Sequence, residues 1–208
     1  NEISGMTLSK NKEVRFASEA KKELNFELTV KSIDGLSSKG IALVIDAGVD
    51  KEKVNSTSFV IPPKALDLEY ITKYLKDMKE EINDGEEIKG RKVSIVIKKV
   101  EEKESQKYEQ AAKVREQGNA TFSPVSENFD LSVMLLKGGS KTDDNNNRSK
   151  EGIVIEKFNE KLAIEIPLKE EVLNNINKEK LGVYRYNPET KAWDYVGGKV
   201  NPNTKKLI

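Results

Sequence analysis

The sequence predicts a mainly β protein of antiparallel, sandwich-like domains, with one amphipathic helix and one short helix. In several segments apolar and polar residues alternate, whereas two other segments repeat apolar residues every three or four positions. Alternation with a period of two is typical of strands with one buried face, and the longer spacing is typical of helices. The 208 residues are 36% hydrophobic, and a chain of this length can bury a core without disulfides.

Four segments carry the alternating strand pattern, and a fifth is apolar throughout. The alternating residues are Leu24, Phe26, Leu28 and Val30; Val93, Ile95 and Ile97; Phe129, Leu131, Val133 and Leu135; and Leu162, Ile164 and Ile166. Such strands belong to antiparallel sheets that face solvent on one side. The uninterrupted apolar run from Ile41 to Ile45 predicts a more central strand.

Two segments predict helices. After Pro62-Pro63, one helical face would carry Leu68, Ile71, Leu75, Met78 and Ile82, which predicts a helix over 66–83 ended by Asn83-Asp84-Gly85. A shorter helix is expected over 169–178, with Val172, Leu173 and Ile176 facing inward. We expect helices of this kind to cover an open end of the sandwich.

A charged stretch suggests where the chain divides. Residues 101–118 are rich in charge and poor in apolar residues, which suits either a solvated helix or a long loop. Of the two we favour a loop with helical tendency between two strands. Because strand alternation restarts at Phe129, we predict two consecutive sandwich-like domains. They are residues 1–120, which include helix 66–83, and residues 121–208, which end in a meander.

The meander is predicted from a near-repeat in the last quarter of the chain. Asn187-Pro188-Glu189-Thr190-Lys191 recurs as Asn201-Pro202-Asn203-Thr204-Lys205. Proline fixes φ at the second position of a turn, and the asparagine side chain bonds back to the backbone. We therefore expect strands at 182–186, 192–196, 199–200 and 206–208, with a bulge or turn at Gly197-Gly198.

Composition argues against several functions. The chain has no histidine and no cysteine, the residues that supply most general bases, strong nucleophiles and soft-metal ligands. We therefore expect no enzyme activity and assign no catalytic residue, cofactor or metal. The 36 basic and 35 acidic residues nearly cancel, so the surface offers no general attraction to nucleic acid. No apolar run approaches the roughly 20 residues that span a bilayer.

One aromatic cluster is a candidate ligand-binding site, formed by Tyr184, Tyr186, Trp193 and Tyr195. On a flat sheet face these rings could stack against sugars. Alternatively, Tyr184 and Tyr186 share one face of their strand and Trp193 and Tyr195 share one face of the next. A hairpin could therefore pair all four across its strands as packing.

Two groups of oxygen donors raise the question of calcium. Asp143, Asp144 and Asn145 to Asn147 lie in the polar run 140–149, but they lack the glycine and glutamate spacing of an EF-hand. We favour a solvated loop there. Asp46 and Asp50, at the ends of the early strand, are a second candidate with no better support.

The tail contains the segments FNEKLAIEIPL (158–168) and LGVYRYNPETKAWDYVGGKVNPNT (181–204), and FVIPPKAL (59–66) lies upstream. These segments resemble a module of large Gram-positive, clostridial-type cell-surface proteins that carry S-layer homology repeats elsewhere. The resemblance covers about 40% of the chain and hardly touches the first 55 residues. It implies that the four rings are scaffold.

These observations lead us to expect a non-catalytic extracellular module at the cell surface or in the cell wall. It would act as a spacer or protein-interaction domain, with neighbouring modules or other surface proteins as its partners. The alternative is a carbohydrate-binding module of a polysaccharide-degrading system, which would use Trp193 and the tyrosines to hold polysaccharide. The residues give no positive support to an enzyme.

Overall fold

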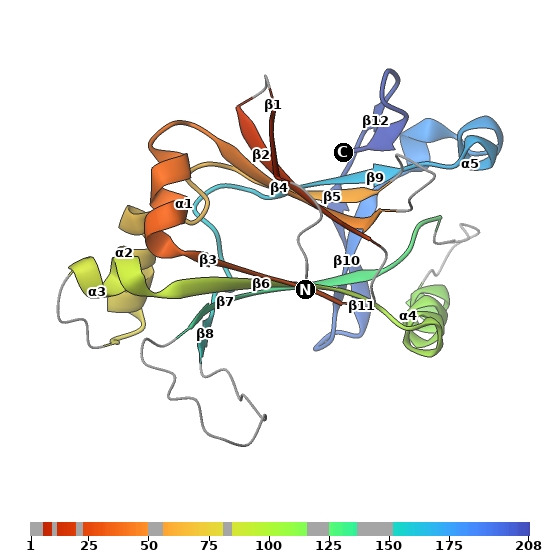
Figure 1. The fold of residues 1–208 in the computed structure, drawn as a ribbon. Helices are drawn as coiled ribbons and strands as arrows, with labels where there is room; N and C mark the ends of the chain where they lie inside the picture. Colours follow the sequence, from red (N-terminus) through yellow and green to blue (C-terminus); the bar gives the residue numbers. More distant parts are fainter. Residues whose placement is uncertain are drawn as a thin grey trace.

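A computed structural model describes residues 6–9, 12–19, 23–49, 56–80, 85–115, 125–136 and 152–208. In it the chain is mainly β, with two sheets that pack against each other, a separate hairpin and five α-helices. Figure 1 shows the two sheets as crossing layers, with helices gathered at both ends. The predicted fold class is confirmed.

The larger sheet has seven strands. Their order is β1 (Met6–Ser9), β2 (Glu13–Glu19), β4 (Ala42–Val49), β5 (Thr57–Ile61), β9 (Ala163–Pro167), β13 (Lys206–Leu207) and β12 (Val200–Asn201). All neighbours are antiparallel except β2 and β4, which run parallel. Strand β4 lies between β2 and β5, as its apolar run predicts, so the sheet is mixed at this one junction.

The smaller sheet has four antiparallel strands. They are β3 (Glu23–Thr29), β6 (Lys92–Lys99), β7 (Phe129–Leu136) and β8 (Gly152–Val154), in this order. The predicted alternation holds in β3, where Leu24, Phe26 and Leu28 pack against the core and the residues between them are exposed or face outward.

The main core lies between the two sheets. Ile45 and Phe59 of the larger sheet belong to the same buried cluster as Ile95 and Val133 of the smaller one. Aromatic rings also meet across the interface, with the centroids of Phe59 and Phe129 5.9 Å apart. Facing apolar sheets that share one core are the arrangement of a sandwich.

This core contradicts the predicted division at residues 120 and 121. Strand β5 is hydrogen bonded to β9, and β6 to β7, so both sheets join strands from before 120 to strands after 121. A cut there would break hydrogen-bonded pairs in both sheets. The charged stretch 101–118 is instead part of the connection between the adjacent strands β6 and β7.

Three helices cover one end of the sandwich (Figure 1). They are α1 (Val30–Ser37), α2 (Leu68–Asp77) and α3 (Gly85–Gly90), which contact one another. Helix α2 confirms the predicted amphipathic helix, with Ile71 and Leu75 buried. It ends at Asp77, however, and Met78 is 55% exposed rather than inward. Ile82 lies outside the described residues.

Two further helices lie at the other end, namely α4 (Glu102–Arg115) and α5 (Glu170–Asn175), followed by the 3₁₀ turn η1 (Lys178–Lys180). Helix α5 and this turn confirm the predicted short helix. Its Val172, Leu173 and Ile176 pack against a small second core built on Leu168, Leu181 and Leu207. Helix α4 covers residues 102–115 of the charged stretch, so the favoured loop is wrong there and the alternative, a solvated helix between two strands, is confirmed.

Candidate functional site

The aromatic hairpin is formed by β10 (Val183–Asn187) and β11 (Ala192–Gly197), which are antiparallel. Their register places Tyr184 opposite Tyr195 and Tyr186 opposite Trp193. The ring centroids are 5.3 Å and 5.5 Å apart in these two pairs. The predicted cross-strand pairing of all four rings is therefore confirmed.

The turn between the strands fixes this register. The Asn187 side-chain oxygen accepts hydrogen bonds from the backbone N–H groups of Glu189 (3.0 Å) and Thr190 (3.2 Å). Lys191 then adopts a positive φ of 50°, the left-handed conformation that often follows a type I turn at the end of a hairpin loop. In the second copy of the motif Asn201 makes the same two bonds, to Asn203 and Thr204. Both Asn-Pro turns form as the sequence predicts.

A fifth ring joins the hairpin to the rest of the molecule. Tyr108, on α4, lies with its ring centroid 4.4 Å from Tyr186 and 6.4 Å from Trp193. In addition, the indole N–H of Trp193 donates a 3.0 Å hydrogen bond to the backbone carbonyl of Tyr108. Tyr186 and Trp193 are thus covered by a helix, and we call Tyr108, Tyr186 and Trp193 the inner rings.

The environment of Tyr108 changes its acidity. The pKa of the Tyr108 phenol is raised to about 12. The largest cause is its partial burial, followed by its 3.0 Å hydrogen bond to Glu104 and the nearby charge of Asp130. Each of these factors disfavours the negatively charged tyrosinate. Tyr108 is therefore packed in the folded chain as the neutral phenol.

The other pair, Tyr184 and Tyr195, lies on the same face of the hairpin and includes its most exposed ring. Tyr195 is 63% exposed, yet its ring is held in place on one side. Gly182 lies against one edge of this ring, and a Cβ atom at that position would collide with the edge. Because only glycine leaves this space, the ring edge approaches the backbone closely, and the ring is tilted by 59° relative to that of Tyr184.

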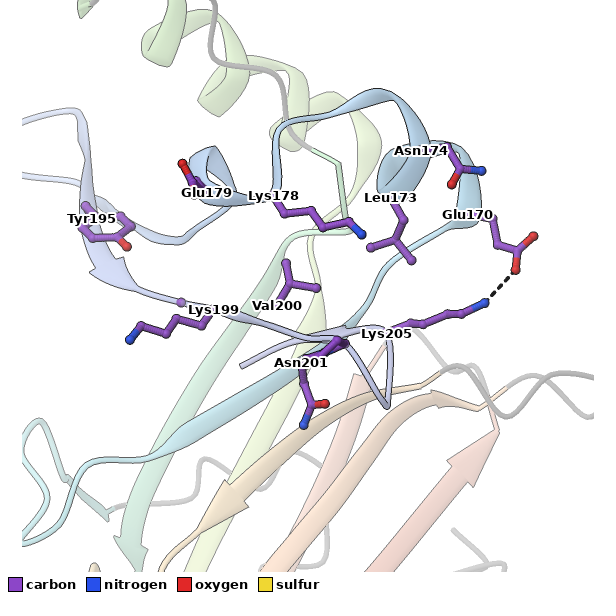
Figure 2. A pocket seen from close by; sticks show the side chains of 12 residues that line it. Glu170, Leu173, Asn174, Lys178, Glu179, Tyr195, Lys199, Val200, Asn201 and Lys205 are labelled. Atoms are coloured by element: carbon purple, nitrogen blue, oxygen red, sulfur yellow. Dashed lines mark hydrogen bonds and ion pairs between the residues drawn. The ribbon is translucent and has the colours of Figure 1, made fainter.

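A groove of about 730 Å³ opens beside Tyr195. Figure 2 shows α5 and η1 along one side, the chain from β11 to the second Asn-Pro turn along the other, and Tyr195 at one end. Leu173 and Val200 form an apolar floor, and Lys178 extends across it. At the far end Lys205 forms a 2.9 Å ion pair with Glu170, which lowers the pKa of that exposed carboxyl group.

The predicted calcium ligands do not form a site in the described residues. Asp46 is buried at 5% exposure, and Arg15 donates bonds of 2.8 Å and 3.0 Å to its two oxygens. Ser58 donates a further 2.6 Å bond to the same carboxylate. Because its oxygens are already engaged, we reject Asp46 as a cation ligand. Asp50 and the run from Asp143 to Asn147 lie outside the described residues.

Two further features are absent from the described residues. In this part of the chain, no three histidine, cysteine or acidic side chains are grouped where they could hold a metal ion. None of the helices described combines the length and apolar character needed to cross a membrane.

Comparisons with known proteins give no relative. No family model matches the sequence, and neither the curated proteins nor the solved structures include a significant match.

Proposed function

We propose that this chain is a non-catalytic extracellular module of a bacterial cell-surface protein, where it acts as a spacer or protein-interaction domain. The resemblance of residues 59–66, 158–168 and 181–204 to modules of Gram-positive surface proteins supports the location. The balance of 36 basic and 35 acidic residues suits a solvated spacer between neighbouring modules.

One observation carries the proposal. Three of the five rings gathered at the hairpin serve to attach it to α4, through ring contacts and the Trp193 hydrogen bond to Tyr108. The tail of the chain is further joined to the sandwich where β13 pairs with β9. A module that has to hold its neighbours apart needs such attachments between its own segments.

The alternative, a carbohydrate-binding platform made of all four predicted rings, has less support. Such a platform requires ring faces that are open to a sugar. Tyr186 and Trp193 instead have Tyr108 packed against them. Of the four predicted ligand residues, Tyr195 alone is exposed, and the other three are half-buried.

Protease treatment of intact cells tests the location. Trypsin added to washed cells of the source organism should release peptides of this chain into the supernatant, since lysine and arginine number 36. A cytosolic enzyme monitored in the same samples is the control for lysis. Peptides that appear only after the cells are broken would contradict the proposal.

A further inference from the structure

The groove beside Tyr195 is the feature that the scaffold role leaves unexplained. Its lining combines a fixed, exposed aromatic ring, a short apolar floor and several lysines. A large exposed ring contributes little to stability, because burial is what stabilises aromatic side chains. Tyr195 is nevertheless fixed in position by Gly182 and Tyr184.

The fixed ring suits a flat, partly apolar ligand. One edge of the Tyr195 ring lies against the backbone at Gly182, and the residue is 63% exposed and lines the groove. A pyranose presents C–H groups on its faces and hydroxyl groups around its rim. It can therefore stack on a phenol ring while its rim contacts polar neighbours.

The charges around the ring narrow the class of ligand. Lys178 and Lys199 line the same groove, and within the described residues neither ammonium group forms an ion pair. Lys205, by contrast, is paired with Glu170, and the Asn201 side-chain oxygen is engaged in its turn. Glu179 also lines the groove, on the side where Tyr195 lies (Figure 2). With Lys205 paired to Glu170, the described lining still carries one more cation than anion, so Lys178 and Lys199 are left to interact with a ligand that carries negative charge.

We propose that this groove binds an acidic polysaccharide, with one sugar stacked on Tyr195 and uronic acid carboxylates along the bound chain directed toward Lys178 and Lys199. The proposal goes beyond the spacer function, which requires no ligand. Phosphate-rich ligands fit less well, because none of the described residues that line the groove is an arginine, which would make the bidentate contacts that phosphates favour.

Binding to matched polymers tests the proposal. Polygalacturonate, alginate and hyaluronan would each be compared with the carboxyl-reduced form of the same polymer, by calorimetric titration of the wild-type chain at low salt. At least one uronate polymer should bind, and its reduced form should bind at least about tenfold more weakly. Added salt should weaken the binding, because it screens exposed charges.

Variants locate the site. Tyr195→Ala should weaken binding at least about tenfold, and Lys178→Gln combined with Lys199→Gln should abolish its salt dependence. Val196→Ala is the matched control, because Val196 is the next residue, is 65% exposed and points to the opposite face of the strand. Circular dichroism would verify that each variant is folded.

Three outcomes would overturn the proposal. They are no binding of any of the three polymers, equal binding of the reduced forms, or equal effects of Tyr195→Ala and Val196→Ala. None of these outcomes bears on surface location, which the protease experiment tests independently.

Discussion

Trp193 illustrates how one side chain joins distant parts of the chain. Its ring meets Tyr186 within the hairpin and Tyr108 on α4, which is 85 residues away in sequence. Its single N–H group donates to a carbonyl of the same helix. If this hydrogen bond were lost, the half-buried N–H group of Trp193 and the carbonyl of Tyr108 would be left without each other as partners. The ring packing and the hydrogen bond therefore support each other.

Truncating this ring should therefore be costly. We expect Trp193→Ala to lower the free energy of unfolding by about 2 to 4 kcal/mol, somewhat below the usual value for fully buried aromatics. Urea denaturation followed by circular dichroism would measure the change. Val196→Ala on the same strand should remain within about 0.5 kcal/mol of wild type. Equal stability of the two variants would show that the Trp193 ring is displayed rather than packed.

Tyr108 predicts how stability depends on alkaline pH. Its pKa in the folded chain, about 12, lies above the ordinary value of 10.0, so folding favours the neutral phenol. This contribution is complete below pH of about 10 and is lost as pH rises to about 12. Tyr108→Phe keeps the ring but cannot ionise. The stability of wild type relative to Tyr108→Phe should therefore decrease over that range.

Urea midpoints of both proteins, measured at a series of pH values, would follow this difference. If the difference between the two proteins stayed constant from pH of about 9 to about 12, the raised pKa of Tyr108 would be refuted.

Part of the site could be predicted from local pattern and part could not. The parity of residues along two strands places Tyr184, Tyr186, Trp193 and Tyr195 on shared faces, and the Asn-Pro motif specifies the turn. Nothing near Tyr108 in the sequence indicates that α4 packs on the hairpin, because that contact depends on tertiary structure. The space above Gly182 is likewise visible only once Tyr195 is placed.

Among the elements, the helices show where local patterns mislead. Val30 continues the alternation of β3, yet it begins α1, because the Thr29 hydroxyl accepts a hydrogen bond from the N–H of Ser32 and caps a helix there. Helix α4 lacks an apolar stripe, so its sequence resembles a solvated loop. Its aromatic contacts come from a single residue, Tyr108.

Helix α2 offers a paired test of which residues face the core. Leu75 is fully buried at 0% exposure, whereas Met78, immediately after the helix, is 55% exposed. Leu75→Asp should cost about 3 to 5 kcal/mol, because it places an unpaired charge in an apolar core. Met78→Asp should cost less than about 1 kcal/mol, mainly through the helix dipole. Thermal unfolding of both variants would measure the difference, and similar melting temperatures would contradict the structure.

At the scale of the whole molecule, several strands follow from the sequence, but the pairing of strands does not. The alternation in β9 predicts a strand, but no strand was predicted over β5. Phe59 of β5 nevertheless pairs with Ile164 of β9, which lies about half the chain length away in sequence. Such a long-range pair leaves no local signal, since each strand would look the same beside another neighbour. The predicted boundary after 120 is wrong for this reason. The charged stretch 101–118 suggested a linker between domains, but it lies within one continuous fold.

The two sheets, the helices and the aromatic hairpin form one cooperative folding unit, and this is the central claim. Differential scanning calorimetry of the wild-type chain tests it most directly. We expect a single transition whose calorimetric enthalpy equals its van't Hoff enthalpy, because β5–β9, β6–β7 and the inner rings join the two halves. Two separate transitions, with the tail melting independently of the sandwich, would contradict the account.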